Sequence, residues 1–145
     1  MDSGREERMR AVYEQLVSIS RRGVARNRLT ATPLTVVQYT LLTFIASSPE
    51  CRAIDIARSM RLNRSTVSRQ VADLEGLGLI EIAAAGVQAG SRGQILQLSD
   101  RGRELLDDSM KANQVELERR LADWTDDEID RLARGLERFN AVDDL

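Results

Sequence analysis

A short polar stretch in the middle of the chain has the residue types and spacing to recognise a nucleic acid. Residues 63–70 read Asn-Arg-Ser-Thr-Val-Ser-Arg-Gln, so hydroxyl and guanidinium groups lie close together. Arginine can pair with the O6 and N7 atoms of guanine, and serine or threonine can reach base edges or phosphates. The same arginines could be ordinary surface charges. The pattern indicates contact with duplex DNA only if a rigid element holds these side chains at the surface.

A helix over about residues 64–77 would position these groups. Apolar residues recur in it at spacings of three and four, at Val67, Val71, Leu74 and Leu77. Asn63 can cap this helix at its start, and Gly78 can stop it. The polar side chains then lie opposite the buried stripe, on the face that could enter a major groove. This face comprises Arg64, Ser65, Thr66, Ser68, Arg69 and Gln70.

The neighbouring segments predict a helix-turn-helix followed by a hairpin. Thr32 and Pro33 have the residue types that open a helix, and a shorter helix follows over about 53–60. Apolar β-like runs at 79–82 and 94–98 are joined by a glycine-containing stretch. We call the hairpin of about residues 79–98 the wing. Its tip carries Arg92, which could reach a minor groove, although such an arginine could also serve solubility.

The two ends of the chain predict long helices that need a partner. A helix over about 5–28 carries an apolar stripe, a second runs from near Ser99 toward Asp123, and Thr125 with Glu128 can form a capping box for a third. The first stripe comprises Met9, Val12, Tyr13, Leu16 and Ile19, and that of the last helix comprises Ile129, Leu132, Leu136 and Phe139. Because exposed apolar stripes are covered in stable proteins, we expect a homodimer.

The composition argues against catalysis. The chain has no histidine and a single cysteine, Cys51, so it lacks the commonest general base and the commonest metal ligand. It also has no glycine-rich phosphate-binding loop. We therefore expect no enzymatic activity, no metal and no cofactor. Cys51 is interpreted as a half-buried, inert thiol.

Charge is divided unevenly along the chain, although the net charge is −2. Residues 51–103 hold eight basic and five acidic side chains, whereas 104–145 hold six basic and 13 acidic ones. A basic centre with an acidic tail is typical of a polyanion-binding module joined to a separate interaction element. The first ten residues are too polar for a signal peptide, and no apolar run approaches the roughly 20 residues of a membrane span. We expect a cytoplasmic protein that does not enter a membrane.

Beyond these patterns, the chain resembles the multiple-antibiotic-resistance regulator (MarR) family over roughly residues 8–140. The stretches that carry the resemblance are residues 34–39 (LTVVQY), 53–57 (AIDIA), 63–69 (NRSTVSR), 74–80 (LEGLGLI) and 98–102 (LSDRG). The resemblance implies a mainly α winged helix-turn-helix fold with a dimerisation region built from the first and last helices. It also implies a pseudo-palindromic DNA operator and release of that DNA by a small-molecule effector.

Carried over by position, the resemblance assigns a role to each residue of the polar stretch. The base-contacting residues would be Ser65, Thr66, Ser68 and Arg69, the contacts to the DNA backbone would be Asn63 and Arg64, and the wing residue would be Arg92. The family usually has an aspartate two places before the wing arginine, where this chain has Gly90. The wing is therefore expected to be held less firmly.

These expectations divide the chain into three parts. They are a dimerisation helix over 1–32, a DNA-binding region over 33–100 and dimerisation helices over 101–145. The predicted function is a sequence-specific transcription regulator, namely a repressor that a small ligand releases. A dimeric module that keeps the fold but binds a protein partner is the alternative. A ligand-binding or catalytic helical protein is a second rival, but it would need a convergent polar pocket that the sequence does not reveal.

Overall fold

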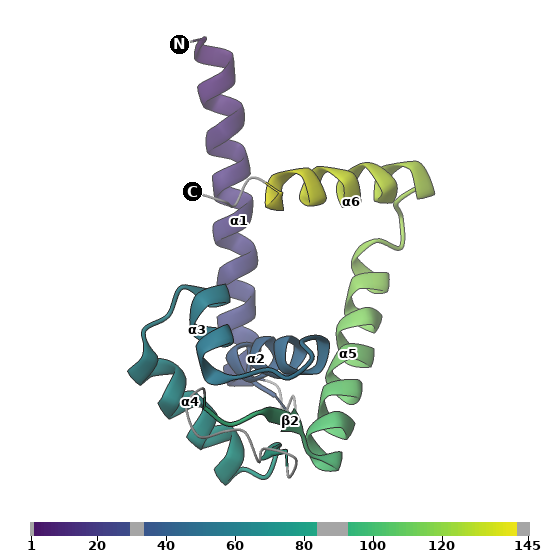
Figure 1. Ribbon diagram of the computed structural model, residues 1–145. Helices are drawn as coiled ribbons and strands as arrows, with labels where there is room; N and C mark the ends of the chain where they lie inside the picture. Colours follow the sequence, from purple (N-terminus) through teal and green to yellow (C-terminus); the bar gives the residue numbers. More distant parts are fainter. Residues whose placement is uncertain (1, 30–33, 84–92, 142–145) are drawn as a thin grey trace. The chain divides into compact units, whose positions relative to one another are not determined.

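The computed structural model of the protein describes residues 2–29, 34–83 and 93–141. The chain divides into two compact units, Met1–Ser109 and Met110–Leu145. The elements are α1 (Ser3–Leu29), α2 (Val36–Ser47), α3 (Ala53–Met60), α4 (Arg64–Gly76), β1 (Ile80–Ile82), β2 (Leu96–Leu98), α5 (Asp100–Arg120) and α6 (Asp126–Asn140) (Figure 1). This element order confirms the predicted mainly α winged helix-turn-helix with a β-hairpin wing.

The core of the first unit lies where α2, α3 and α4 meet the two strands (Figure 1). Apolar side chains from all five elements are buried there, and the most deeply buried include Leu41, Leu42, Ile56, Val67 and Leu74. Each full burial of such a side chain contributes about 1.5–3 kcal/mol. Because the apolar residues of α4 are three and four residues apart, their burial turns one face of this helix inward and leaves its polar face outside.

The wing is a two-stranded antiparallel hairpin that is tied to the start of α3. Ile80 pairs with Leu98 and Ile82 with Leu96. Ile80, Leu96 and Leu98 are buried in the core, whereas Ile82 is exposed. The backbone N–H of Leu96 also donates to the carbonyl oxygen of Cys51, at 2.7 Å. The segment before α3 thus continues the hydrogen bonding of the hairpin, which couples the base of the wing to the helix-turn-helix.

The predicted start of α2 is wrong by three residues. Thr35, not Thr32, caps the helix, and Thr32 and Pro33 lie outside the described residues. The Oγ1 atom of Thr35 accepts a hydrogen bond from the backbone N–H of Gln38, and the Gln38 Oε1 atom accepts one from the N–H of Thr35. Such a reciprocal pair needs Glu or Gln three residues after the cap, and Thr32 is followed by Thr35 at that position.

A close approach of backbones sets the start of α5. Ser99 donates from its hydroxyl to the carbonyl oxygen of Gly78 and accepts from the N–H of Gly102. A Cβ atom at Gly102 would overlap the carbonyl oxygen of Leu79, so a larger residue there would push α5 away from the wing. Gly78 itself has φ +73°, which fits its predicted role in ending α4.

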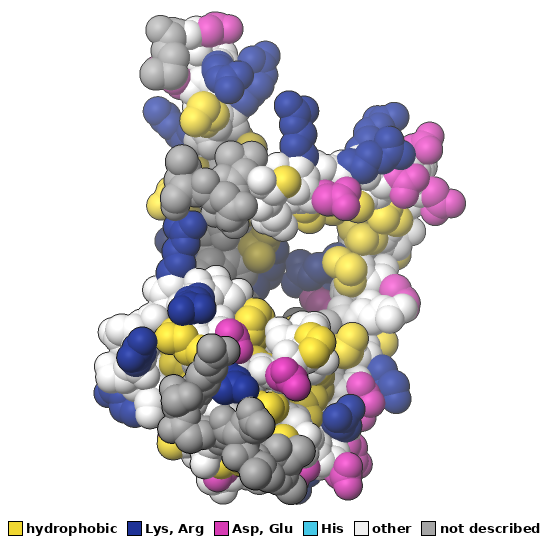
Figure 2. All heavy atoms as spheres, viewed as in Figure 1, with side chains coloured by type: hydrophobic (Ala, Val, Ile, Leu, Met, Phe, Trp, Pro, Cys, Tyr) yellow, Lys and Arg dark blue, Asp and Glu magenta, His cyan; other side chains and the backbone are white. Residues whose placement is uncertain are grey.

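The terminal helices keep apolar side chains at the surface. Met9, Tyr13 and Ile19 of α1 are more than half exposed, and so is Phe139 of α6. Figure 2 shows apolar side chains at the surface of both helices. In α6 the predicted capping box between Thr125 and Glu128 is present. Among the described residues, no helix is both long enough and apolar enough to cross a membrane.

Candidate nucleic-acid interface

The start of α4 is built by Asn63. Its Oδ1 atom accepts hydrogen bonds from the backbone N–H of Thr66 and from the hydroxyl of Ser65, both at 2.8 Å. This confirms Asn63 as the cap of α4. Because phosphate oxygens accept hydrogen bonds, only the amide N–H groups of Asn63 could contact a phosphate.

The other predicted contact residues do not all lie on one face of α4. Arg64, Ser65, Ser68 and Arg69 are exposed. At 100° per residue, Ser65, Ser68 and Arg69 fall within an arc of roughly 100°. Thr66 is half-buried on the flank of the helix, next to the core side. The outward face therefore carries fewer predicted base contacts than the sequence pattern indicates.

The polar residue at the end of the stretch is turned inward. Gln70 is half-buried, and its Oε1 atom is buried without a hydrogen-bond partner among the described residues. The prediction that Gln70 belongs to the exposed polar face is therefore wrong. On a helical wheel it lies beside Val67 and Leu74, so it follows the apolar stripe rather than the hydroxyl groups.

Arg69 is folded back along its own helix. Its Nε–H donates to the carbonyl oxygen of Ser65, at 3.4 Å. A bond of this length is weak, and the side chain is exposed. Rotation about the side-chain torsions would release the guanidinium group toward a base edge at little cost.

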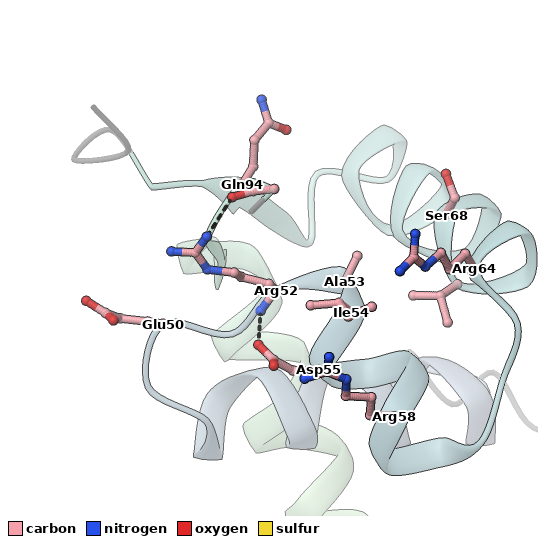
Figure 3. A pocket seen from close by; sticks show the side chains of 11 residues that line it. Glu50, Arg52, Ala53, Ile54, Asp55, Arg58, Arg64, Ser68 and Gln94 are labelled. Carbon is pink, nitrogen blue, oxygen red and sulfur yellow. Dashed lines mark hydrogen bonds between the residues drawn. The ribbon is translucent and has the colours of Figure 1, made fainter. Parts of the chain in front are cut away.

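An open groove of about 860 Å³ lies beside α4. Three arginines line it, Arg52, Arg58 and Arg64, and we call them the groove arginines. In Figure 3 Arg52 and Arg64 approach the groove from opposite sides, one from the start of α3 and the other from the start of α4. No sequence motif singles out Arg52 or Arg58. Their only signal was the excess of basic residues in the central region.

Arg52 also links α3 to the base of the wing. Its guanidinium group donates to the carbonyl oxygen of Gly93, at 3.2 Å. Gly93 has φ +80°, a conformation that glycine adopts without strain. The Asp55 carboxylate accepts from the backbone N–H of Arg52, at 2.9 Å, and so holds the first turn of α3. Arg92 and Gly90 lie outside the described residues, so the predicted wing contact stays a prediction.

Cys51 is buried more deeply than predicted. Its side chain is 1% exposed rather than half-buried. Burial, with a smaller contribution from the nearby Asp55 charge, raises the pKa of the thiol to about 11. The thiol therefore stays protonated at neutral pH, which is unfavourable for a reactive cysteine.

One known family matches the segment that contains the helix-turn-helix. The sequence profile of the MarR family matches residues 32–89, which span α2, the helix-turn-helix and the first strand of the wing. Over these residues the chain is similar to the MarR family. Comparison with curated proteins found no match.

Solved MarR structures are similar to the chain over nearly its whole length. A MarR family protein from Bacillus stearothermophilus is 23% identical, with a TM-score of 0.73 over 93% of this chain and 95% of that one. FabT of Streptococcus pneumoniae, solved in complex with DNA, is 16% identical, with a TM-score of 0.68 over 94% and 93%. Staphylococcus aureus MarR, in complex with salicylate and kanamycin, is 16% identical, with a TM-score of 0.79 over 97% and 95%. The chain has the fold of MarR family transcription regulators.

Proposed function

We propose that the protein is a sequence-specific regulator of transcription that binds double-stranded DNA. The observation that carries this proposal is the exposed face of a capped α4, which presents Ser65, Ser68 and Arg69 away from a well-packed core. Hydrogen-bonding side chains on a rigid helix can enter a major groove and distinguish base pairs. The DNA-bound state of the similar FabT supports the same reading.

Each predicted contact has a defined role in this proposal. Ser65, Ser68 and Arg69 contact bases, Thr66 contacts them only from the flank of the helix, and Arg64 and Asn63 contact the sugar–phosphate backbone. Arg92 reaches the minor groove from the wing. The arginines supply most of the affinity and its salt dependence, and α4 supplies the discrimination between sequences.

The regulator acts as a homodimer in this proposal. The apolar stripes of α1 and α6 remain exposed in the single chain, which supports pairing through residues 1–32 and 101–145. Two copies of α4 would then enter successive major grooves about 10 base pairs apart. A pseudo-palindromic operator follows from that two-fold symmetry.

Repression with release by a small-molecule effector completes the proposal. The salicylate complex of the similar Staphylococcus aureus protein supports an effector of drug-like size. A ligand that binds one spacing of the two α4 helices better than the other would shift operator occupancy. We propose no catalytic step, and we expect the protein to act in the cytoplasm.

The test is selection of bound sequences from a random duplex library by the purified protein, at about 0.1 M salt, where exposed charges are screened beyond ~10 Å. We expect an inverted repeat with half-sites about one helical turn apart. Retention without a motif would reduce the protein to a non-specific DNA binder. Failure to retain any duplex would refute the proposal and favour the module that binds a protein partner.

A further inference from the structure

The groove beside α4 is cationic, and two of its three arginines, Arg52 and Arg58, lie outside the polar stretch of α4. Its lining combines the three groove arginines with the apolar residues Ala53, Ile54 and Val67. Within the part of the chain that the structure describes, none of the groove arginines forms an ion pair. Most of their N–H donors are therefore free to bind an anion from outside the chain.

The groove lies between the two elements that would enter adjacent grooves of duplex DNA. It is bounded on one side by the start of α4 and on the other by Gln94 at the base of the wing (Figure 3), and Gly93 also lines it. In B-DNA a single sugar–phosphate strand separates a major groove from the adjacent minor groove. A protein that places a helix in one and a hairpin in the other must therefore hold that strand between them.

We infer that this groove binds the sugar–phosphate strand that crosses between α4 and the wing, with Arg52 and Arg58 as phosphate contacts. The inference rests on the proposed function and adds two binding residues to it. Arginine suits this role because its planar group makes two parallel hydrogen bonds to a phosphate. The contacts are independent of base sequence and so contribute affinity rather than discrimination.

The hydrogen bond of Arg52 fixes its guanidinium group in place. One N–H is used by the carbonyl oxygen of Gly93, and the remaining donors are left for a phosphate. A half-buried side chain held at one point loses less conformational freedom on binding than a fully mobile one. Arg52 thus both positions the base of the wing and faces the anion.

Two acidic residues in the same lining do not cancel this charge. The Asp55 carboxylate is engaged by the backbone N–H of Arg52, where it stabilises the first turn of α3. Glu50 is exposed at the outer edge and is surrounded by solvent. Three arginines against two carboxylates leave the groove positive, and the excess charge lies between α4 and the wing.

The salt dependence of DNA binding tests this inference without knowledge of the operator. We would measure the affinity of the full chain for a mixed-sequence duplex over a range of salt concentrations. The variants are Arg52→Gln, Arg58→Gln and Arg52→Lys, with Arg103→Gln as the matched control because Arg103 is exposed in the same unit and does not line the groove. Thermal unfolding of each variant would verify that it is folded.

The slope of log K against log salt is negative. We expect Arg52→Gln and Arg58→Gln each to make it less steep, by about 0.9 per subunit, because each removes one phosphate contact. Arg52→Lys keeps a positive charge and should retain the slope, as should Arg103→Gln. Once an operator is known, the base preference of both glutamine variants should match that of the unchanged protein.

Unchanged slopes in both glutamine variants, with normal DNA binding by the unchanged protein, would overturn the inference and leave the proposed function standing. A loss confined to one of the two glutamine variants would also overturn it, because the inference requires both Arg52 and Arg58 to contact a phosphate. If the unchanged protein bound no duplex at any salt concentration, the inference and the proposed function would fail together.

Discussion

The apolar stripes of α4 and α6 have the same helical spacing but opposite surroundings. In α4, Val67 and Leu74 are 1% exposed, because they belong to the core that α2, α3 and the wing share. Leu77, which the sequence places in the same stripe, lies beyond the end of the helix and is 54% exposed. In α6, Leu136 and Phe139 are 45% and 59% exposed. Periodicity alone therefore shows which face of a helix is apolar, but not whether the same chain covers it. The first unit completes its own core, and the apolar face of α6 remains available to a second copy.

The largest expected effect comes from removing a core side chain. Leu74→Ala should lower the free energy of unfolding by about 2–5 kcal/mol, because it leaves a cavity among fully packed neighbours. Leu136→Ala should lower it less, and the loss should depend on protein concentration if Leu136 is buried between two copies. Urea unfolding at two protein concentrations measures both. Equal and concentration-independent losses would remove the distinction between the two stripes.

A pair of glycines sharpens the same comparison. Gly102→Ala should destabilise the protein by about 1–3 kcal/mol, since its Cβ would overlap the Leu79 carbonyl oxygen. At Gly135 in α6, a Cβ meets nothing within 4 Å. Gly135→Ala should therefore stabilise the helix, by up to about 1 kcal/mol. Thermal unfolding of both variants tests this, and a neutral Gly102→Ala would contradict the close approach.

The buried thiol of the first unit predicts a pH dependence at high pH. The raised pKa of Cys51 contributes stability that is complete below the ordinary thiol pKa of about 8.5 and is lost as the pH rises through about 11. Between pH 8 and pH 10.5 the free energy of unfolding of the unchanged protein should fall by about 1–2 kcal/mol more than that of Cys51→Ala. Urea unfolding of the two proteins at both pH values gives this difference. Identical losses would mean that the thiol is not buried in solution.

Removing either of the two N-caps should cost a similar amount of stability, but only one removal should affect DNA binding. Asn63→Ala and Thr125→Ala each remove a cap and should cost about 1 kcal/mol. Only Asn63→Ala should also weaken DNA binding, because Asn63 holds the first turn of α4 together with Ser65. Thermal unfolding and binding to duplex DNA separate the effects. Equal weakening by Thr125→Ala would place a DNA contact outside the first unit.

The smallest effect is expected at the exposed ion pairs of α5. Hydrogen bonds from Arg119 and Arg120 lower the pKa of Glu116 to about 2. The stability that these pairs contribute is present above the ordinary carboxyl pKa of about 4.3 and is lost as the pH falls through about 2. Because water and salt screen exposed pairs, Glu116→Gln should change stability only slightly at pH 7. An NMR titration of Glu116 with an ordinary midpoint would contradict the pairing.

The sequence by itself determined the features that depend on neighbours along the chain. The apolar period located α3, α4 and α6, and hydrogen-bonding residue types identified the caps at Asn63 and Thr125. The start of α2 was missed because Thr32 and Thr35 are both good caps. The side chain of Gln38, three residues after Thr35, decides between them.

Only the tertiary structure decided the features that join distant residues. Arg52, Arg58 and Arg64 belong to separate turns of the chain, and they share a groove only because α3 and α4 pack side by side. In the same way, the burial of Cys51 and the link from Arg52 to Gly93 depend on where the wing meets α3. Local residue types specify helices and their caps through bonds within a few residues. A binding groove is specified by packing between elements, which the sequence pattern does not contain.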